Sequence, residues 1–128
     1  MRNNMVFLKQ ITGKGRGVMA AIDLTAHTLI ETAPVIVMEA KDMLLLDQTL
    51  LHDYIFEWGE SKTQCCMALG LVPMYNHSNE SNCEYFMNYE DETIDVKTMQ
   101  DVKAGEELTI NYNGNWNDQS DVWFAVTK

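Results

Sequence analysis

The sequence predicts a mainly β protein, built from several small sheets with one short helical insert. Short apolar runs recur through most of the chain and are separated by Gly, Asn, Asp and Thr. Only the middle of the chain has apolar residues at roughly helical spacing. The 128 residues, of which 46% are hydrophobic, suit a single packed core. We therefore expect one domain over residues 1–128.

The first half of the chain predicts four strands. The apolar residues 6–9 form the first, and the second follows at 18–22, after a stretch with three glycines. A loop leads to a third run at 29–30, and a fourth strand is predicted at 35–38. The glycines predict a turn between the first two strands.

The middle of the chain differs, because its leucines, aromatic residues and polar residues alternate at roughly helical spacing. One or two short helices are predicted within residues 41–56. Residues 65–71 predict another short helix that ends near Gly70.

Strands resume in the last third of the chain. They are predicted at 83–89, 93–98 and 108–112, with a hairpin turn over residues 88–92.

Two segments of the chain share a local pattern. Residues 23–30 and 101–108 each begin with Asp and an apolar residue, continue through a polar turn and enter a new strand. The pattern predicts two similar strand–turn–strand units.

The charge balance is strongly acidic, with 19 Asp and Glu against 9 Lys and Arg and a net charge of -10. Such a chain would repel phosphates, so direct nucleic-acid binding is not expected. It would attract a basic protein or peptide and speed its encounter. The alternative is that the acidity only maintains solubility, since net charge does not determine fold.

The three cysteines do not predict a metal site or a disulfide framework. Cys65, Cys66 and Cys83 are odd in number and show no zinc-ligand spacing. Reduced thiols indicate an intracellular protein, cytoplasmic or, if the source is eukaryotic or viral, nuclear. The sequence shows neither a signal-peptide core nor an apolar run of membrane length, so no membrane association is expected.

Three stretches are candidates for chemistry, although each also has a purely structural interpretation. Glycine-rich residues 13–17 would let the backbone approach a ligand closely, or form an ordinary turn. Asn76-His77-Ser78 would hold a polar ligand, or form a structural loop in which His77 bonds a backbone carbonyl. Tyr112, at the end of a strand, would orient an amine or help remove its proton, or only pack its ring.

In their order and spacing these stretches resemble the SET domain family. The resemblance rests on four motifs, which are Gly13-Lys14-Gly15-Arg16-Gly17-Val18, Met74-Tyr75-Asn76-His77-Ser78, Ser81-Asn82-Cys83, and Gly105-Glu106-Glu107-Leu108-Thr109 closing on Tyr112. It extends from about Val6 to Trp116 and is greatest with the short free-standing SET proteins of viral and bacterial type.

The resemblance implies a β-clip fold of small sheets, with the C-terminal segment passing through a loop as a pseudoknot. It implies a protein-lysine methyltransferase that uses S-adenosyl-L-methionine (S-adenosylmethionine). The implied cofactor-binding residues are Lys14, Gly15, Arg16, Asn76 and His77. Tyr112 would be the catalytic tyrosine, and Tyr54 and Trp116 would line the channel for the substrate lysine.

The chain departs from many SET enzymes in two ways. It carries no cysteine-rich zinc segments, and Asn113 stands where glycine is common. One of the aromatic residues Trp116, Trp123 and Phe124 is expected to cover the adenine or the lysine channel in place of a zinc segment.

Several alternatives stay open at this point. The chain could be a non-catalytic SET-like module that binds a basic peptide, an unrelated β-clip binding domain, or a SET enzyme with a substrate other than protein lysine. A homodimer that completes each site is a further hypothesis.

Overall fold

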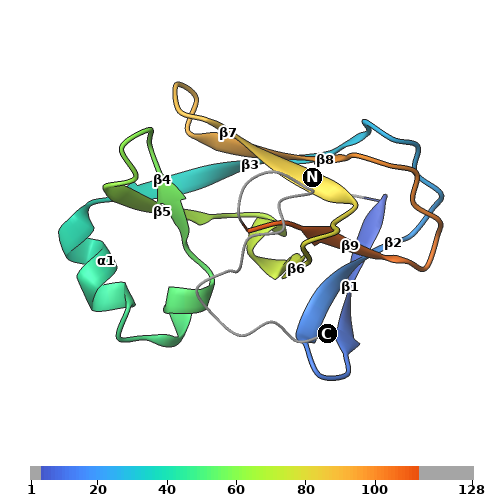
Figure 1. Cartoon of the computed structure of the whole chain (residues 1–128), viewed down its shortest axis with the longest axis horizontal. Coiled ribbons are helices and arrows are strands. Elements are labelled where there is room, and N and C mark those ends of the chain that lie inside the picture. Colours follow the sequence, from blue (N-terminus) through green and yellow to red (C-terminus); the bar gives the residue numbers. More distant parts are fainter. Residues whose placement is uncertain (1–3, 113–128) are drawn as a thin grey trace.

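The computed structural model describes residues 4–112, which form two β-sheets with a small helical insert (Figure 1). A four-stranded sheet has the order β1-β2-β9-β6, and a five-stranded sheet has the order β4-β5-β3-β8-β7. The strands are β1 (Val6–Ile11), β2 (Gly15–Ala20), β3 (Leu29–Met38), β4 (Phe56–Trp58), β5 (Gln64–Ala68), β6 (Asn76–His77), β7 (Cys83–Asn88), β8 (Thr93–Thr98) and β9 (Glu107–Ile110). The helices are α1 (Ala40–Leu46) and the 3-10 helices η1 (Leu50–Asp53) and η2 (Val72–Met74).

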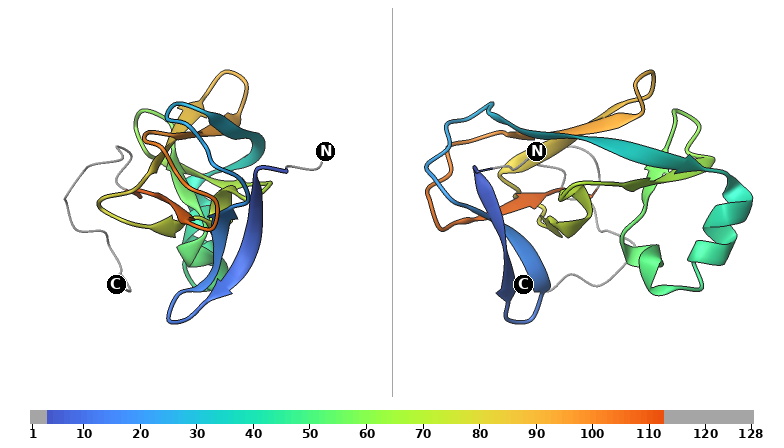
Figure 2. Two further views of the ribbon diagram at one scale, coloured as in Figure 1. Left: turned by 90° about the vertical axis from the view of Figure 1, so that its right-hand side faces the viewer. Right: turned by 180° about the vertical axis from the view of Figure 1, so that it is seen from behind.

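The predicted mainly β architecture of several small sheets is confirmed. One or two short helices were predicted in the middle of the chain, and the structure has two there, α1 and η1, which project at one end of the molecule (Figures 1 and 2). The β1–β2 hairpin lies at the opposite end, and β6 and β9 lie between the two (Figure 2). The hairpin predicted at residues 88–92 joins β7 to β8.

Two predictions about the strands of the first half were wrong. The strands predicted at residues 29–30 and 35–38 are a single strand, β3, which continues through Pro34. Residues 29–34 pair with β8 and residues 35–38 pair with β5. Proline lacks an N–H donor, and it is tolerated here because it stands where the strand changes its main partner. The second strand, β2, begins at Gly15 and ends at Ala20, earlier than predicted.

The helix predicted over residues 65–71 is also wrong, because this segment contains strand β5. Cys66 pairs with Phe56 of β4 on one side and with Val37 of β3 on the other. Cys65, Cys66 and Ala68 are all buried. A strand buried on both faces is apolar without alternation, so its periodicity does not distinguish it from a buried helix.

The two similar segments form reciprocal contacts across the molecule. Leu24 and Val102 exchange both of their backbone hydrogen bonds, at 2.7 and 2.8 Å. The Asp101 carboxylate accepts from the backbone N–H of Ala26 (2.9 Å), and Asp23 accepts from that of Ala104 (2.8 Å).

The correspondence extends to the flanking strands. β2 and β8 end at Ala20 and Thr98, and β3 and β9 begin at Leu29 and Glu107. The predicted pair of strand–turn–strand units is confirmed, and it links the two sheets. The carboxylates act as turn caps for each other's unit.

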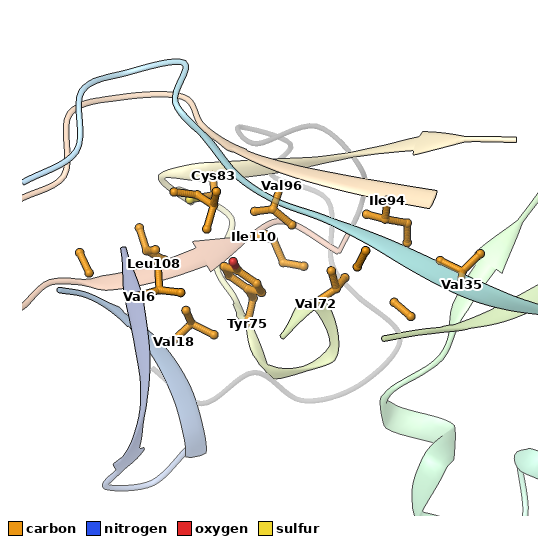
Figure 3. Close-up of a cluster of buried hydrophobic side chains, with 14 of the residues drawn as sticks. Val6, Val18, Val35, Val72, Tyr75, Cys83, Ile94, Val96, Leu108 and Ile110 are labelled. Carbon is orange, nitrogen blue, oxygen red and sulfur yellow. The ribbon is translucent and has the colours of Figure 1, made fainter. Parts of the chain in front are cut away.

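The core lies between the two sheets and draws apolar side chains from both (Figure 3). Val18, Leu108 and Ile110 come from the four-stranded sheet, whereas Ile94 and Val96 come from the five-stranded sheet. All five side chains are fully buried. Burying an apolar side chain of this size contributes about 1.5–3 kcal/mol, so this shared core is the main force that joins the sheets.

The three cysteines are buried and unpaired with one another. Burial raises the pKa of Cys66 and of Cys83 to about 12. Both remain protonated thiols at neutral pH, so they serve as core residues and not as nucleophiles. Within residues 4–112, no helix has the length and apolar character needed to cross a membrane.

We expect Gly105→Ala to lower the free energy of unfolding by about 1 kcal/mol, because Gly105 has a φ of 88°. An added Cβ would meet no atom within 4 Å, so the loss would come from the backbone and not from a clash. His27, at the corresponding position of the other unit, has a φ of 67°. His27→Gly is therefore the matched variant and is expected to lose no stability. Urea denaturation measures both, and an unchanged Gly105→Ala protein would contradict this account.

Candidate functional site

The site is organised by a parallel pairing between β6 and β9. Asn76 pairs with Thr109, His77 pairs with Ile110, and the Ser78 N–H donates to the Ile110 carbonyl at 3.0 Å. This pairing brings the Asn-His-Ser stretch beside the strand that leads to Tyr112.

The chain then returns along β9 through Asn82. Its side-chain amide donates to the Glu107 carbonyl and accepts from the Thr109 N–H, each at 2.9 Å. Residues 76–82 therefore contact β9 at both ends. The predicted threading of the C-terminal segment as a pseudoknot concerns residues after Tyr112, which lie outside the described residues.

Tyr112 is held by its hydroxyl and by both of its backbone polar groups. The hydroxyl donates to the Tyr75 carbonyl at 2.7 Å, and the backbone N–H donates to His77 Nδ1 at 3.0 Å. The Tyr112 carbonyl accepts from the Tyr85 hydroxyl at 3.3 Å. Burial raises the pKa of Tyr112, and the neighbouring Tyr54 hydroxyl adds to this effect. The hydroxyl is thus protonated at neutral pH and acts as a hydrogen-bonding group.

His77 is buried and neutral, and it positions Tyr112. Its Nδ1 accepts the Tyr112 N–H, so the ring proton is on Nε2, which donates to Asn79 Oδ1 at 2.7 Å. Burial lowers the pKa of His77, which favours this neutral form. Both ring nitrogens are therefore engaged by the protein itself. Contact between His77 and a cofactor stays a prediction. Because both ring nitrogens are already bonded, such a contact would be made by the His77 backbone.

Aromatic side chains surround Tyr112. The Phe56 ring meets the Tyr85 ring edge-on, with centroids 5.2 Å apart, and lies 6.5 Å from the Tyr112 ring. Tyr54 interacts electrostatically with Tyr112, so the structure brings this predicted channel residue to the site. The other predicted channel residue, Trp116, lies outside the described residues.

The sequence analysis did not identify Phe56 or Tyr85 as site residues. Alternation was the available signal, since Phe56 stands two residues after Tyr54 and Tyr85 two residues after Cys83. Burial raises the pKa of Tyr85 to about 12, and the nearby Glu57 carboxylate adds to the shift. The group therefore combines aromatic surface with neutral hydroxyls.

The glycine-rich turn meets the Asn76 side chain. Asn76 Nδ2 donates to Glu107 Oε2 at 2.7 Å and, more weakly, to the Arg16 carbonyl at 3.4 Å. Lys14 Nζ lies 3.1 Å from Glu107 Oε1. Gly15 has a φ of 81°, which favours glycine, and open space where a Cβ would stand. The predicted residues Lys14, Gly15, Arg16 and Asn76 are thus brought together, and their binding of a cofactor stays a prediction.

Two further residues of this cluster were not identified from sequence. A Cβ on Gly17 would lie 2.7 Å from Glu107 Oε2 and 2.8 Å from Asn76 Nδ2, so glycine leaves room for the bond between them. The signal for Gly17 was its place as the third glycine of the stretch 13–17. Glu107 gave no separate signal, since it is one of two adjacent glutamates and only the fold distinguishes them.

Glu31 supports the backbone that receives the Tyr112 hydroxyl. Its carboxylate accepts from the Tyr75 hydroxyl and from the Leu71 N–H, each at 3.1 Å. Tyr75 is itself almost fully buried (Figure 3). Burial raises the pKa of Glu31. By tying both ends of the turn over residues 71–75, Glu31 fixes the Tyr75 carbonyl opposite Tyr112.

Chemically, the arrangement has two parts. One is the cluster around Asn76, which contains backbone groups of the glycine-rich stretch, the Asn76 amide and the Lys14–Glu107 ion pair. It suits a polar ligand that carries a positive and a negative charge. The other is an aromatic group around Tyr112, suited to orienting an amine. The short β6 strand and His77 connect them, since Asn76 belongs to the first part and His77 holds Tyr112 in the second.

Comparison with known proteins identifies the family of this chain. The family described as SET domain matches residues 15–113. The histone-lysine N-methyltransferase of Schizosaccharomyces pombe that is specific for H3 lysine-37 is 33% identical over 112 residues, covering 87% of this chain and 71% of that protein.

Solved structures show the same fold. A crystal structure of a Plasmodium falciparum protein superposes with a TM-score of 0.64 and 20% identity, covering 90% of this chain and 98% of the other. The Chaetomium thermophilum Polycomb Repressive Complex 2 bound to S-adenosylmethionine gives a TM-score of 0.71 and 22% identity. There the match covers 87% of this chain but only 15% of the other. The family match and the identity to the yeast enzyme extend over most of the chain, which therefore belongs to the SET domain family.

Proposed function

We propose that this SET domain transfers the methyl group of S-adenosylmethionine to the side-chain amine of a lysine in a histone or another basic protein. The observation that carries the proposal is the placement of the Tyr112 hydroxyl. It is fixed at 2.7 Å from the Tyr75 carbonyl, among aromatic side chains and beside the Asn76-His77 strand. The 33% identity to a histone-lysine N-methyltransferase supports the same activity.

The cluster around Asn76 fits the amino-acid end of S-adenosylmethionine. Lys14, Gly15, Arg16, Asn76 and His77 would hold the cofactor, through side chains and through the backbone of the turn. The cofactor would supply a methyl group attached to a sulfonium sulfur, and that sulfur would keep the electron pair of the carbon–sulfur bond as the neutral thioether. The residues fit because the open space at Gly15 and the polar groups of Lys14 and Asn76 lie together.

The aromatic group around Tyr112 suits the acceptor amine. Only the neutral amine has a lone pair to form the new carbon–nitrogen bond, yet free lysine has a pKa of about 10.4. The rings of Phe56, Tyr85 and Tyr112 would disfavour the charged ammonium by removing it from water. Tyr112, whose raised pKa keeps its proton, would orient the amine toward the methyl group and would not act as a base.

Charge around the aromatic group supports a basic substrate. Glu57 and Glu84 act electrostatically on Tyr85, and Asp53 acts on Tyr112. Together with the net charge of -10, these carboxylates would attract lysine- and arginine-rich segments. The same charge disfavours direct nucleic-acid binding. A histone substrate would place the enzyme inside the cell, with access to chromatin proteins.

A homodimer that completes the site remains a proposal. Sedimentation at assay concentration tests it, and a fully active monomer would remove it. Nothing in residues 4–112 favours the non-catalytic alternative, because Tyr112, Asn76 and His77 are all present and held in place.

Replacing the tyrosine tests the activity directly. Tyr112→Phe should lower kcat by about 100-fold or more, because it removes the hydroxyl that orients the amine while retaining the ring. The assay is transfer of radiolabelled methyl to mixed histones, with cofactor binding measured by calorimetry. Tyr89→Phe is the matched control, since Tyr89 packs on Trp58. Cofactor binding without transfer by Tyr112→Phe supports the proposal, whereas full activity of this variant contradicts it.

The neutral state of His77 predicts acid sensitivity. The folded pKa of His77 lies below its ordinary value of 6.5, so the unfolded chain takes up this proton first as the pH falls. The stabilising contribution is present above about pH 6.5 and is lost as the pH falls through the folded pKa. Unfolding free energies measured by urea denaturation from about pH 7.5 to 5 should show this loss.

His77→Asn provides the comparison for this pH series. Asparagine retains an acceptor for the Tyr112 N–H but does not titrate. Subtracting the unfolding free energy of His77→Asn from that of the wild type at each pH cancels the contribution of carboxyl groups such as Glu31. The raised pKa of Glu31 gives a pH dependence opposite to that of His77. Parallel pH curves for wild type and His77→Asn would contradict the account of His77 as a buried neutral acceptor.

A further inference from the structure

We propose that Glu107 is a positioning residue of the cofactor site, which fixes the Asn76 amide so that its oxygen meets the ammonium group of S-adenosylmethionine. The inference rests on the proposed function and adds a residue that is not expected to touch the substrate lysine. It starts from the position of the Glu107 carboxylate, which lies between Lys14 and Asn76.

The orientation of the Asn76 amide follows from the chemistry of its partner. A carboxylate oxygen only accepts hydrogen bonds, so the amide nitrogen must face Glu107 Oε2, which lies 2.7 Å away. The Arg16 carbonyl, also an acceptor, requires the same orientation at 3.4 Å. Both hydrogen bonds that the Asn76 side chain makes within residues 4–112 use Nδ2. The amide oxygen is therefore the atom that a ligand can use.

The environment strengthens this contact. The Glu107 side chain is only 17% exposed, so solvent screens its charge less than it would at an open surface. Gly17 lies next to the pair, because a Cβ there would come within 2.7 Å of Glu107 Oε2 and 2.8 Å of Asn76 Nδ2, and closer still to Ile11 Cδ1. The absence of a side chain at Gly17, in strand β2, thus leaves room for the bond between Glu107 and Asn76.

The same carboxylate holds Lys14 on its other oxygen, at 3.1 Å. The amino-acid end of the cofactor carries an ammonium and a carboxylate. The Asn76 oxygen and the Arg16 carbonyl are acceptors for the ammonium, and the Lys14 ammonium is a donor for the carboxylate. Glu107 therefore keeps both halves of this recognition in place. Without it only the longer contact with the Arg16 carbonyl, at 3.4 Å, would orient the amide.

Two nucleosides separate a positioning role from a general structural one. S-adenosylhomocysteine carries the amino-acid end of the cofactor, whereas 5′-methylthioadenosine lacks it. In calorimetry on the full chain, Glu107→Ala should lower the affinity for S-adenosylhomocysteine about tenfold. This is the loss typical of one hydrogen bond to a charged group. Binding of 5′-methylthioadenosine should stay unchanged. In the transfer assay the KM for S-adenosylmethionine should rise more than kcat falls.

Glu106→Ala is the matched control, because it removes the same charge from the adjacent, exposed glutamate, which caps the Lys103 N–H. It should leave the affinity for both nucleosides unchanged. Thermal melting of each variant verifies folding. If Glu107→Ala lowers the affinity for both nucleosides equally, or for neither, the inference is overturned while the proposed function stays intact.

A charge swap provides the rescue. Asn76→Asp alone sets one carboxylate against another and should weaken S-adenosylhomocysteine. Adding Glu107→Gln reverses the hydrogen bond, because the new amide donates to the new carboxylate, whose second oxygen still faces the ligand. The double variant should bind S-adenosylhomocysteine more tightly than Asn76→Asp, and failure to recover would count against the inference. If the wild type binds neither nucleoside, the proposed function fails together with it.

Discussion

The parallel pairing of β6 with β9 is the constraint on which the rest of the site depends. It is only two residues long, yet it joins the Asn-His-Ser stretch to strand β9, which ends at Ile110, two residues before Tyr112. So short a pairing cannot be stable on its own. It persists because Asn82 contacts β9 a second time and because Leu108 and Ile110 are buried in the shared core. The core therefore positions the candidate site residues through a single strand, β9.

Polar groups around this strand are held by a small number of partly buried hydrogen bonds. Glu31 fixes Tyr75, whose carbonyl receives the Tyr112 hydroxyl, and His77 receives the Tyr112 N–H. Among the described residues, no buried side-chain nitrogen or oxygen lacks a hydrogen-bond partner. This matters because an unsatisfied buried polar group costs about 1–3 kcal/mol. The site is thus preorganised by groups that would not touch a lysine substrate themselves.

The pair of strand–turn–strand units places two different residues at equivalent positions of the fold. Both units share the Asp caps and the exchanged backbone bonds of Leu24 and Val102. At the first residue of the following strand they diverge, because Leu29 begins β3 whereas Glu107 begins β9. The shared backbone geometry fixes the position of this residue, and the side chain at that position determines which contacts it makes. In the second unit it is a carboxylate directed at Lys14 and Asn76.

The sequence by itself determined the mainly β class, the family and the repeated units, and it singled out candidate residues such as Asn76, His77 and Tyr112 that the fold brings together, because glycine turns, strand alternation and the ordered motifs are local signals. It did not determine that residues 65–68 form a strand or that β3 continues through Pro34, because both depend on partners distant in the chain. Phe56, Tyr85 and Glu107 were not identified as site residues from the sequence for the same reason. Their roles arise from contacts with Tyr112 and Asn76, and only the folded sheets bring those residues within hydrogen-bonding or ring-packing distance.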